Sequence, residues 1–232
     1  MDTNDYLTWL DYSTQVLTDY ENLQKVVPNL VTNKVMELYS GDDTKYLDDV
    51  LKDAQLTPEQ QCKAIAQTMK GAKLFQVGGA KVVGINFSAR TTLEVREWPN
   101  GLPDFAHYGD EVYGGKTRND RAQEGSKIPL KRFVFPRPFA LCTLPHKDIS
   151  MQSVKNDDGE FRMYQGVWRM QPLPGCAPPG QQAMRLTYAV EISPRPYLPV
   201  RLVEGRIAQD LCTNLKAIRT FVTETQKSKI PS

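Results

Sequence analysis

The sequence predicts an α+β fold in which a curved antiparallel sheet packs around one long C-terminal helix. Several segments between residues 30 and 192 alternate apolar and polar side chains, as strands with one buried face do. Residues 199–224 instead carry apolar side chains three or four positions apart, which is the spacing of an amphipathic helix. Such a stripe has to be buried, and the sheet is the only predicted surface large enough to bury it.

The C-terminal helix is the strongest predicted element. Pro199 suits its first turn, where a missing backbone N–H costs nothing. Its apolar stripe extends over about five turns and consists of Val203, Ile207, Leu211, Leu215, Ile218 and Val222.

The predicted sheet precedes this helix. Its strands are expected at residues 30–39, 74–77, 80–85, 86–98, 149–154, 160–171 and 184–192. Gly78 and Gly79 predict a tight hairpin turn between the second and third of these, because glycine tolerates positive φ. In the last strand the even-numbered residues from Met184 to Ile192 are expected to face inwards, and Arg185, Thr187 and Glu191 outwards.

Short helices are expected near the N-terminus. One covers residues 5–17, and a second begins after a cap at Thr18 or Asp19 and ends before Pro28. Two further helices are expected within residues 43–70, the second starting at Thr57-Pro58 and ending at Gly71.

Length and composition exclude several classes of protein. The 232 residues, 40% hydrophobic and 24% charged, are typical of a globular chain, and we expect a single domain over residues 1–232. No run of eighteen apolar residues predicts a transmembrane segment. Four cysteines without a C-x-x-C pair, and only two histidines, argue against a zinc ribbon, a disulfide scaffold or a histidine-rich metal site. We therefore expect no metal and no cofactor, and interpret Cys142 and Cys212 as core thiols.

Charge is unevenly distributed along the chain. Residues 1–60 hold four Lys or Arg against twelve Asp or Glu, whereas residues 61–232 hold twenty-five against fifteen. Within the aperiodic, Pro- and Gly-rich segment 99–148, residues 116–137 are strongly basic and also contain Phe133 and Phe135. One interpretation is an arm that contacts an anionic or protein partner. In the other, its phenylalanines, with nearby Phe139, fold back onto the sheet edge. The candidate contact residues are Lys116, Arg118, Arg121, Lys127, Lys131 and Arg132.

No catalytic motif is present. The sequence lacks G-x-S-x-G, H-E-x-x-H, a Walker loop and G-x-G-x-x-G. His146 is interpreted as a loop residue and Asp157-Asp158-Gly159 as a turn. We assign no catalytic residue, and we expect neither an enzyme nor a nucleic-acid partner.

Several blocks of sequence, in order, resemble the polyketide cyclase/dehydrase and lipid-transport family of the START-like, helix-grip superfamily, which includes coenzyme-Q-binding proteins. The resemblance covers residues 16–40, 72–98 and 149–224. The sequence of these blocks is most similar to that of cyanobacterial and plastid members. The blocks are residues 18–23, 27–30, 76–78, 87–90, 166–168, 186–188, 196–199, 202–204 and 210–219. Two features depart from the family pattern. Residues 1–15 do not predict the usual first strand, and residues 41–71 (helical) and 99–148 (a basic loop) are insertions.

The resemblance implies a helix-grip fold and a non-catalytic module that binds or carries a lipid, quinone or isoprenoid pigment. A structural or assembly subunit of a photosynthetic or other membrane-associated complex is the alternative, and a cyclase-type enzyme is the third. The resemblance also implies a plastid location, in the stroma or on the thylakoid surface with peripheral membrane contact, although no leader is recognisable in the chain. We expect the ligand cavity to be lined by Phe87, Trp168, Leu186, Tyr188, Val190, Val203, Ile207 and Leu211.

Overall fold

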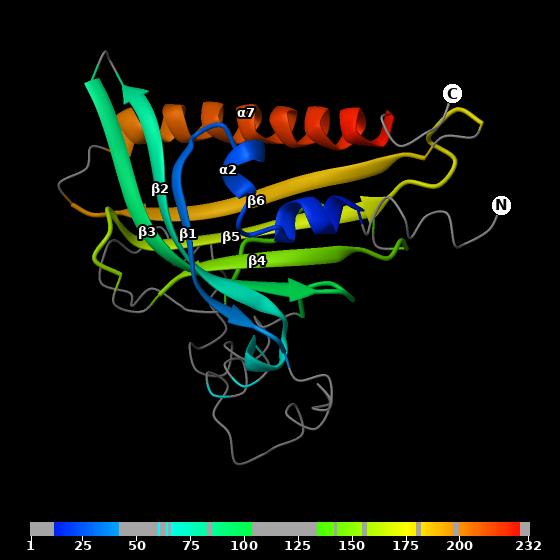
Figure 1. Ribbon diagram of the computed structural model, residues 1–232, viewed down its shortest axis with the longest axis horizontal. Coiled ribbons are helices and arrows are strands. Elements are labelled where there is room, and N and C mark those ends of the chain that lie inside the picture. Colours follow the sequence, from blue (N-terminus) through cyan, green and yellow to red (C-terminus); the bar gives the residue numbers. More distant parts are fainter. Residues whose placement is uncertain are drawn as a thin grey trace, which may run out of the picture.

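Within the described residues six antiparallel strands form one sheet, and a long helix lies across it (Figure 1). The computed structural model describes residues 12–41, 60, 64, 66–82, 85–103, 134–141, 143–154, 157–179, 182–196 and 200–227. The strands follow one another in chain order across the sheet. They are β1 Leu30–Tyr39, β2 Gly71–Val82, β3 Ile85–Trp98, β4 Lys147–Ser153, β5 Phe161–Pro172 and β6 Met184–Pro194. The predicted α+β class is therefore confirmed.

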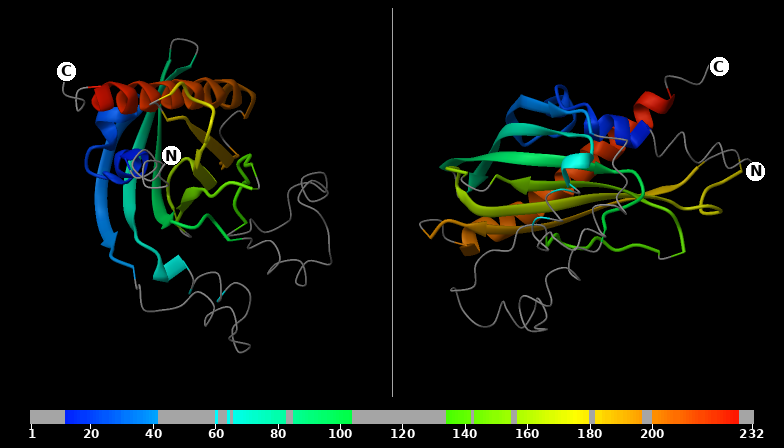
Figure 2. Two further views of the ribbon diagram at one scale, coloured as in Figure 1. Left: turned by 90° about the vertical axis from the view of Figure 1, so that its right-hand side faces the viewer. Right: turned by 90° about the horizontal axis from the view of Figure 1, so that it is seen from below.

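Helix α7, Val200–Lys227, lies along the concave side of the curved sheet (Figure 2). Helix 12–18 and the short helix α2, Leu23–Val26, precede β1, and α2 contacts both β1 and α7. Part of the predicted helix 5–17 lies outside the described residues. No helix in the described part of the chain is long and apolar enough to cross a membrane.

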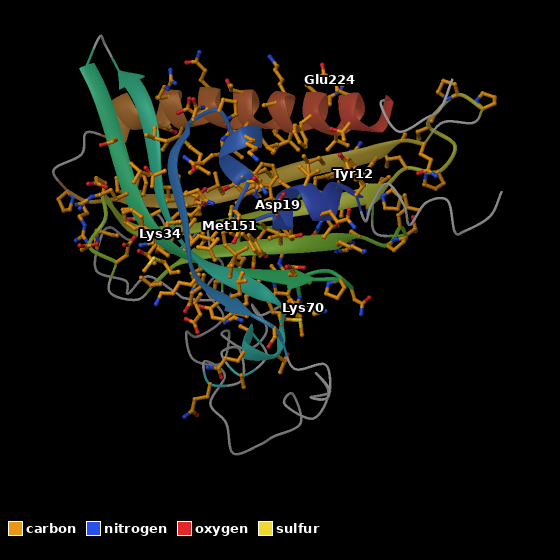
Figure 3. The ribbon with its side chains drawn as sticks, in the orientation of Figure 1. Tyr12, Asp19, Lys34, Lys70, Met151 and Glu224 are labelled. Atoms are coloured by element: carbon orange, nitrogen blue, oxygen red, sulfur yellow. The ribbon has the colours of Figure 1, made fainter. Side chains whose placement is uncertain are left out.

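The main core lies between the sheet and the C-terminal half of α7. Ile218 and Val222 of the helix are 1% and 6% exposed and belong to the same buried cluster as strand residues Leu74, Leu93 and Trp168. Tyr12 of helix 12–18 and Met151 of β4 pack against this cluster (Figure 3). Burial of the predicted stripe is thus confirmed at this end of the helix.

The predicted turn at Gly78-Gly79 is wrong, because both glycines lie inside β2. The strand continues to Val82 and pairs with β3 without a register shift, so the two strands predicted at 74–77 and 80–85 are largely one. The two glycines instead allow the neighbouring strand β1 to lie close to β2. The Gly79 N–H donates to the Asn29 carbonyl at 2.9 Å, and a Cβ at Gly79 would lie 2.5 Å from Val31 Cγ2. Glycine here permits a close approach of strands rather than a reversal of the chain.

The predicted cap of the second short helix is also wrong. The N-cap residue of α2 is Asn22, and its side chain makes no capping hydrogen bond. Instead the Asn22 amide donates to the Asp19 carboxylate at 2.9 Å, while the Thr18 hydroxyl donates back to the Thr14 carbonyl at 2.9 Å. Thr18 therefore belongs to the preceding helix, as Ser and Thr side chains do when they bond one turn back.

The face of the sheet away from α7 carries a buried polar network. Asp148 of β4 pairs across the strands with Arg169 of β5, on the face opposite Ile149 and Trp168. Arg169 Nε and Nη2 donate to the two Asp148 carboxylate oxygens at 2.8 and 2.7 Å, and both residues are buried. The Leu102 N–H donates to Asp148 at 2.8 Å, and Arg169 Nη1 donates to the Pro138 carbonyl at 2.9 Å. The two described ends of segment 99–148 are thereby fastened to the sheet.

The structure tests only some of the other predictions made for segment 99–148 and its surroundings. All six candidate partner-contact residues, Lys116 to Arg132, lie outside the described residues, as do Phe133, Cys142 and most of the helical insertion 41–71. Phe135 is buried at 7% exposure, whereas Phe139 is 63% exposed. The two phenylalanines therefore do not both fold back onto the protein, nor do both remain exposed as in a partner-contact arm. Asp157 is more than a turn residue, since its carboxylate accepts hydrogen bonds from the Thr91 hydroxyl at 2.7 Å and the Thr92 N–H at 3.3 Å.

Candidate functional site

The candidate site lies on the concave face of the sheet, where β5 and β6 run beneath α7. In the antiparallel register of these strands Trp168 pairs with Tyr188, Gly166 with Val190 and Tyr164 with Ile192. Paired residues of an antiparallel sheet project to the same face. Trp168 belongs to the core cluster and Tyr188 packs against it, so this row faces α7.

Two aromatic side chains form the fixed part of this row. The rings of Trp168 and Tyr188 stack with centroids 4.0 Å apart and an angle of 10° between their planes. The Tyr188 side chain extends over Gly166, where a Cβ would lie 2.7 Å from Tyr188 Oη and 3.2 Å from Met151 Cε. A glycine inside a strand can mark such a close approach. Any larger residue at position 166 would displace the Tyr188 hydroxyl.

The Tyr188 hydroxyl meets the Tyr164 hydroxyl in a hydrogen bond across the two strands. Burial raises the pKa of Tyr164, and it raises the pKa of Tyr188 well above 10, with a further contribution from the neighbouring Tyr164. Desolvation disfavours a phenolate, so both groups stay neutral at physiological pH and keep their protons for hydrogen bonding.

Packing beneath α7 is uneven along the helix. Ile207 and Leu211, in its N-terminal half, are half-buried and lie outside the core cluster that contains Ile218 and Val222. The neighbouring strand β6 shows the same feature, because all eleven of its residues are half-buried. The predicted inward facing of Met184, Leu186 and Tyr188 is confirmed, because they pack against the core cluster, but the inward and outward rows do not differ in burial class. Neither the inward nor the outward row of this strand is fully covered by the described part of the protein.

A row of polar side chains flanks the apolar stripe of α7. Arg206, Asp210 and Asn214 each precede a stripe residue by one position, and all three are half-buried. Arg206 Nη2 lies 2.9 Å from Asp210 Oδ1, which neutralises the guanidinium charge. Arg206 Nε and Asn214 Oδ1 are buried atoms without a hydrogen-bond partner among the described residues. The sequence did not predict this polar row, because polar residues beside an apolar stripe usually face water.

The predicted cavity residues fall into three groups. The side chains of Phe87 and Val203 lie outside the described residues. Trp168 is in the core cluster, and Leu186 and Tyr188 pack against it. Val190, Ile207 and Leu211 are half-buried and separate from that cluster.

The sequence did not predict Tyr164 and Gly166 as members of the inward-facing row of β5 and β6. Both lie an even number of positions from Trp168, so strand periodicity carried the signal that would have found them. Cys212, predicted as a core thiol, is exposed, because it follows Leu211 and points away from the stripe.

The chemistry of the described residues suits apolar contact and neutral hydrogen bonding. Within the described ranges no three His, Cys, Asp or Glu side chains gather in a way that could hold a metal ion. His146 is half-buried, with Nε2 3.8 Å from Asp148 Oδ2 on the opposite face of the sheet from Tyr188.

Comparison with known proteins adds a weak similarity of fold. No family model matches the chain, and no curated protein matches it. A solved structure, TTHA0849 from Thermus thermophilus, superposes with a TM-score of 0.42 at 10% sequence identity, over 92% of this chain and 86% of that chain. Neither a family nor a function for this chain follows from a similarity at that level.

Proposed function

We propose that the chain is a non-catalytic module that binds or carries an apolar ligand, in the class of lipids, quinones and isoprenoid pigments, on a START-like helix-grip fold. The observation that carries the proposal is the half-burial of inward-facing apolar residues beneath the N-terminal half of α7. Val190, Ile207 and Leu211 are half-buried there, while Ile218 of the same helix is 1% exposed. An apolar ligand between α7 and β6 would cover the apolar surface that the described residues leave half-buried.

The energetics favour such an occupant. Removing apolar surface from water contributes about 25 cal/mol per Å², so covering several half-buried aliphatic side chains supplies binding free energy without a charged contact. The Trp168–Tyr188 stack adds a broad, rigid aromatic surface to the same row. A small number of polar groups, here the Tyr164 and Tyr188 hydroxyls, would then orient the ligand.

The tyrosine pair favours binding over cyclase chemistry. A general acid or base works best with a pKa near the working pH. Burial moves the pKa of Tyr164 and of Tyr188 upward, away from neutrality. These phenols are suited to hold a ligand rather than to exchange protons with it.

Mass spectrometry of organic extracts from the purified protein tests the proposal. The matched variants are Leu211→Arg, which places a charge on the inward face of α7, and Cys212→Arg, which places the same charge on its exposed neighbour. We expect one apolar compound in stoichiometric amount from the wild type and from Cys212→Arg, and its loss from folded Leu211→Arg. Extracts that contain no such compound, or the same compound in all three proteins, would contradict the proposal.

A second candidate is a subunit that uses the sheet as a scaffold within a larger complex, including a plastid membrane-associated one. The observation in its favour is the exposed apolar surface of β1, at one edge of the described sheet. Val31, Met36 and Leu38 are 62%, 54% and 66% exposed. An edge strand of this kind is a common site for another chain to pair. Empty extracts, together with a protein partner whose binding is lost on Met36→Lys and Leu38→Lys substitution, would favour this function instead.

A further inference from the structure

We infer that the ligand carries a neutral hydrogen-bond acceptor of the carbonyl type, as in a ketone, quinone or ester, and that the Tyr164–Tyr188 hydroxyl pair holds this oxygen. The inference rests on the proposed function and specifies the chemistry of its ligand.

Two phenols supply two hydroxyl protons, and the hydrogen bond between Tyr164 and Tyr188 uses one of them. The other proton has no acceptor among the described residues. The contact of Tyr164 with Ser153 does not use it, because there the backbone N–H of Tyr164 donates to Ser153 Oγ at 3.1 Å. Both side chains are half-buried, and a hydroxyl donor that is largely shielded from water is costly to leave unpaired. The pair therefore offers one unused donor on the face beneath α7.

The neighbours of the pair favour a neutral acceptor over an anionic one. The rings beside it are Trp168, stacked on Tyr188, and Phe161, whose centroid lies 6.2 Å from that of Tyr164. An ionised head group among such side chains needs a cation to offset its desolvation. On the inward side of α7 Asp210 already offsets the charge of the Arg206 guanidinium, although Arg206 Nε has no hydrogen-bond partner among the described residues. A carbonyl oxygen accepts the phenolic proton without bringing a charge.

The pair is also held in position before any ligand arrives. Stacking on Trp168 fixes the Tyr188 ring, and the absence of a side chain at Gly166 provides the space its hydroxyl occupies. A donor fixed in this way loses little conformational freedom on binding. The hydroxyl pair thus selects for an acceptor at one place in an otherwise apolar surface.

The test compares two probes that differ only in a carbonyl group. Decanophenone and decylbenzene have the same chain length and ring, and each is titrated against protein loaded with the neutral fluorophore N-phenyl-1-naphthylamine. The proteins are the wild type, the double variant Tyr164→Phe/Tyr188→Phe, and Tyr39→Phe as the matched control. Tyr39 lies against Arg96 at the far end of β1, with the guanidinium carbon 3.7 Å from its ring centroid.

We expect the wild type and Tyr39→Phe to bind decanophenone roughly tenfold more tightly than decylbenzene, which is the size of one hydrogen bond's net contribution. The double phenylalanine variant should bind both probes with equal affinity, at about the affinity of the wild type for decylbenzene. Equal affinities in the wild type, or a preference that survives in the double variant, would overturn the inference while leaving the proposed function intact. Failure of the fluorophore and of both probes to bind the wild type would contradict the proposed function itself.

Discussion

At the scale of single residues, the most demanding interaction is the ion pair between Asp148 and Arg169. Both side chains are buried, and each has a second fixed partner: the Leu102 N–H for the carboxylate and the Pro138 carbonyl for the guanidinium. A buried pair tolerates the loss of one member poorly, because the other charge is left without compensation. This pair joins β4, β5 and both described ends of segment 99–148.

Replacement of Asp148 by Asn should therefore lower the free energy of unfolding by about 3–5 kcal/mol, as measured by chemical denaturation. The control is Arg90→Gln, which removes the ion pair with Glu160 at 3.3 Å, where the arginine side chain is 51% exposed. That change should cost about 0–1 kcal/mol, because solvent screens an exposed pair. Similar losses in the two variants would show that the Asp148–Arg169 pair does not hold the segment to the sheet.

Residue-level reasoning from the sequence recovered only part of the candidate site. It identified Trp168, Leu186 and Tyr188 by strand alternation, but it did not find the hydroxyl contact between Tyr164 and Tyr188. That contact depends on a cross-strand register and on the free space at Gly166, neither of which is local to one segment. The burial of Arg206, Asp210 and Asn214 was not predicted for a similar reason. Helix periodicity gives the direction of the buried face but not its width.

At the scale of elements, hydrophobic periodicity predicted most of the strands and the long helix. The first strand was expected at residues 30–39 and is Leu30–Tyr39, and the helix expected at 199–224 is Val200–Lys227. The error at Gly78-Gly79 arose because glycine serves two purposes, a sharp turn or a close strand approach, and local sequence does not distinguish them. Burial along β6 and α7 could not be predicted either, because it depends on how far the helix stands from the sheet.

The apolar stripe of α7 should thus contribute unequally to stability along its length. Ile218→Ala should lower the free energy of unfolding by about 2–5 kcal/mol, because it removes a side chain that is 1% exposed within the main core. Leu211→Ala should cost clearly less, since Leu211 is half-buried and outside that cluster. Chemical denaturation of the two variants measures both values. A cost for Leu211→Ala as large as that for Ile218→Ala would mean that the helix is packed evenly on the sheet.

At the scale of the whole molecule, the six-stranded sheet, α7 and the short helices before β1 share a core that is well packed at the C-terminal half of α7, whereas Ile207 and Leu211 nearer its start are half-buried. The well-packed end is built from the core cluster around Ile218, Val222 and Leu74. The half-buried residues Ile207 and Leu211 lie in the N-terminal half of α7, which begins close to the end of β6 (Figure 1). We propose that stability and ligand binding depend on different halves of the same helix.

The most direct test of this assignment is a fluorescence titration with N-phenyl-1-naphthylamine that measures how many probe molecules bind per chain and how tightly. The wild type is compared with Leu211→Trp, which fills the inward face of α7, and with Cys212→Trp, which adds the same side chain to the exposed neighbour. We predict one probe molecule per chain for the wild type and for Cys212→Trp, and an affinity at least roughly tenfold weaker for Leu211→Trp, because the added ring occupies the ligand's place. Absence of stoichiometric binding to the wild type, or an affinity that Leu211→Trp leaves unchanged, would contradict the claim that the interior beneath α7 receives an apolar ligand.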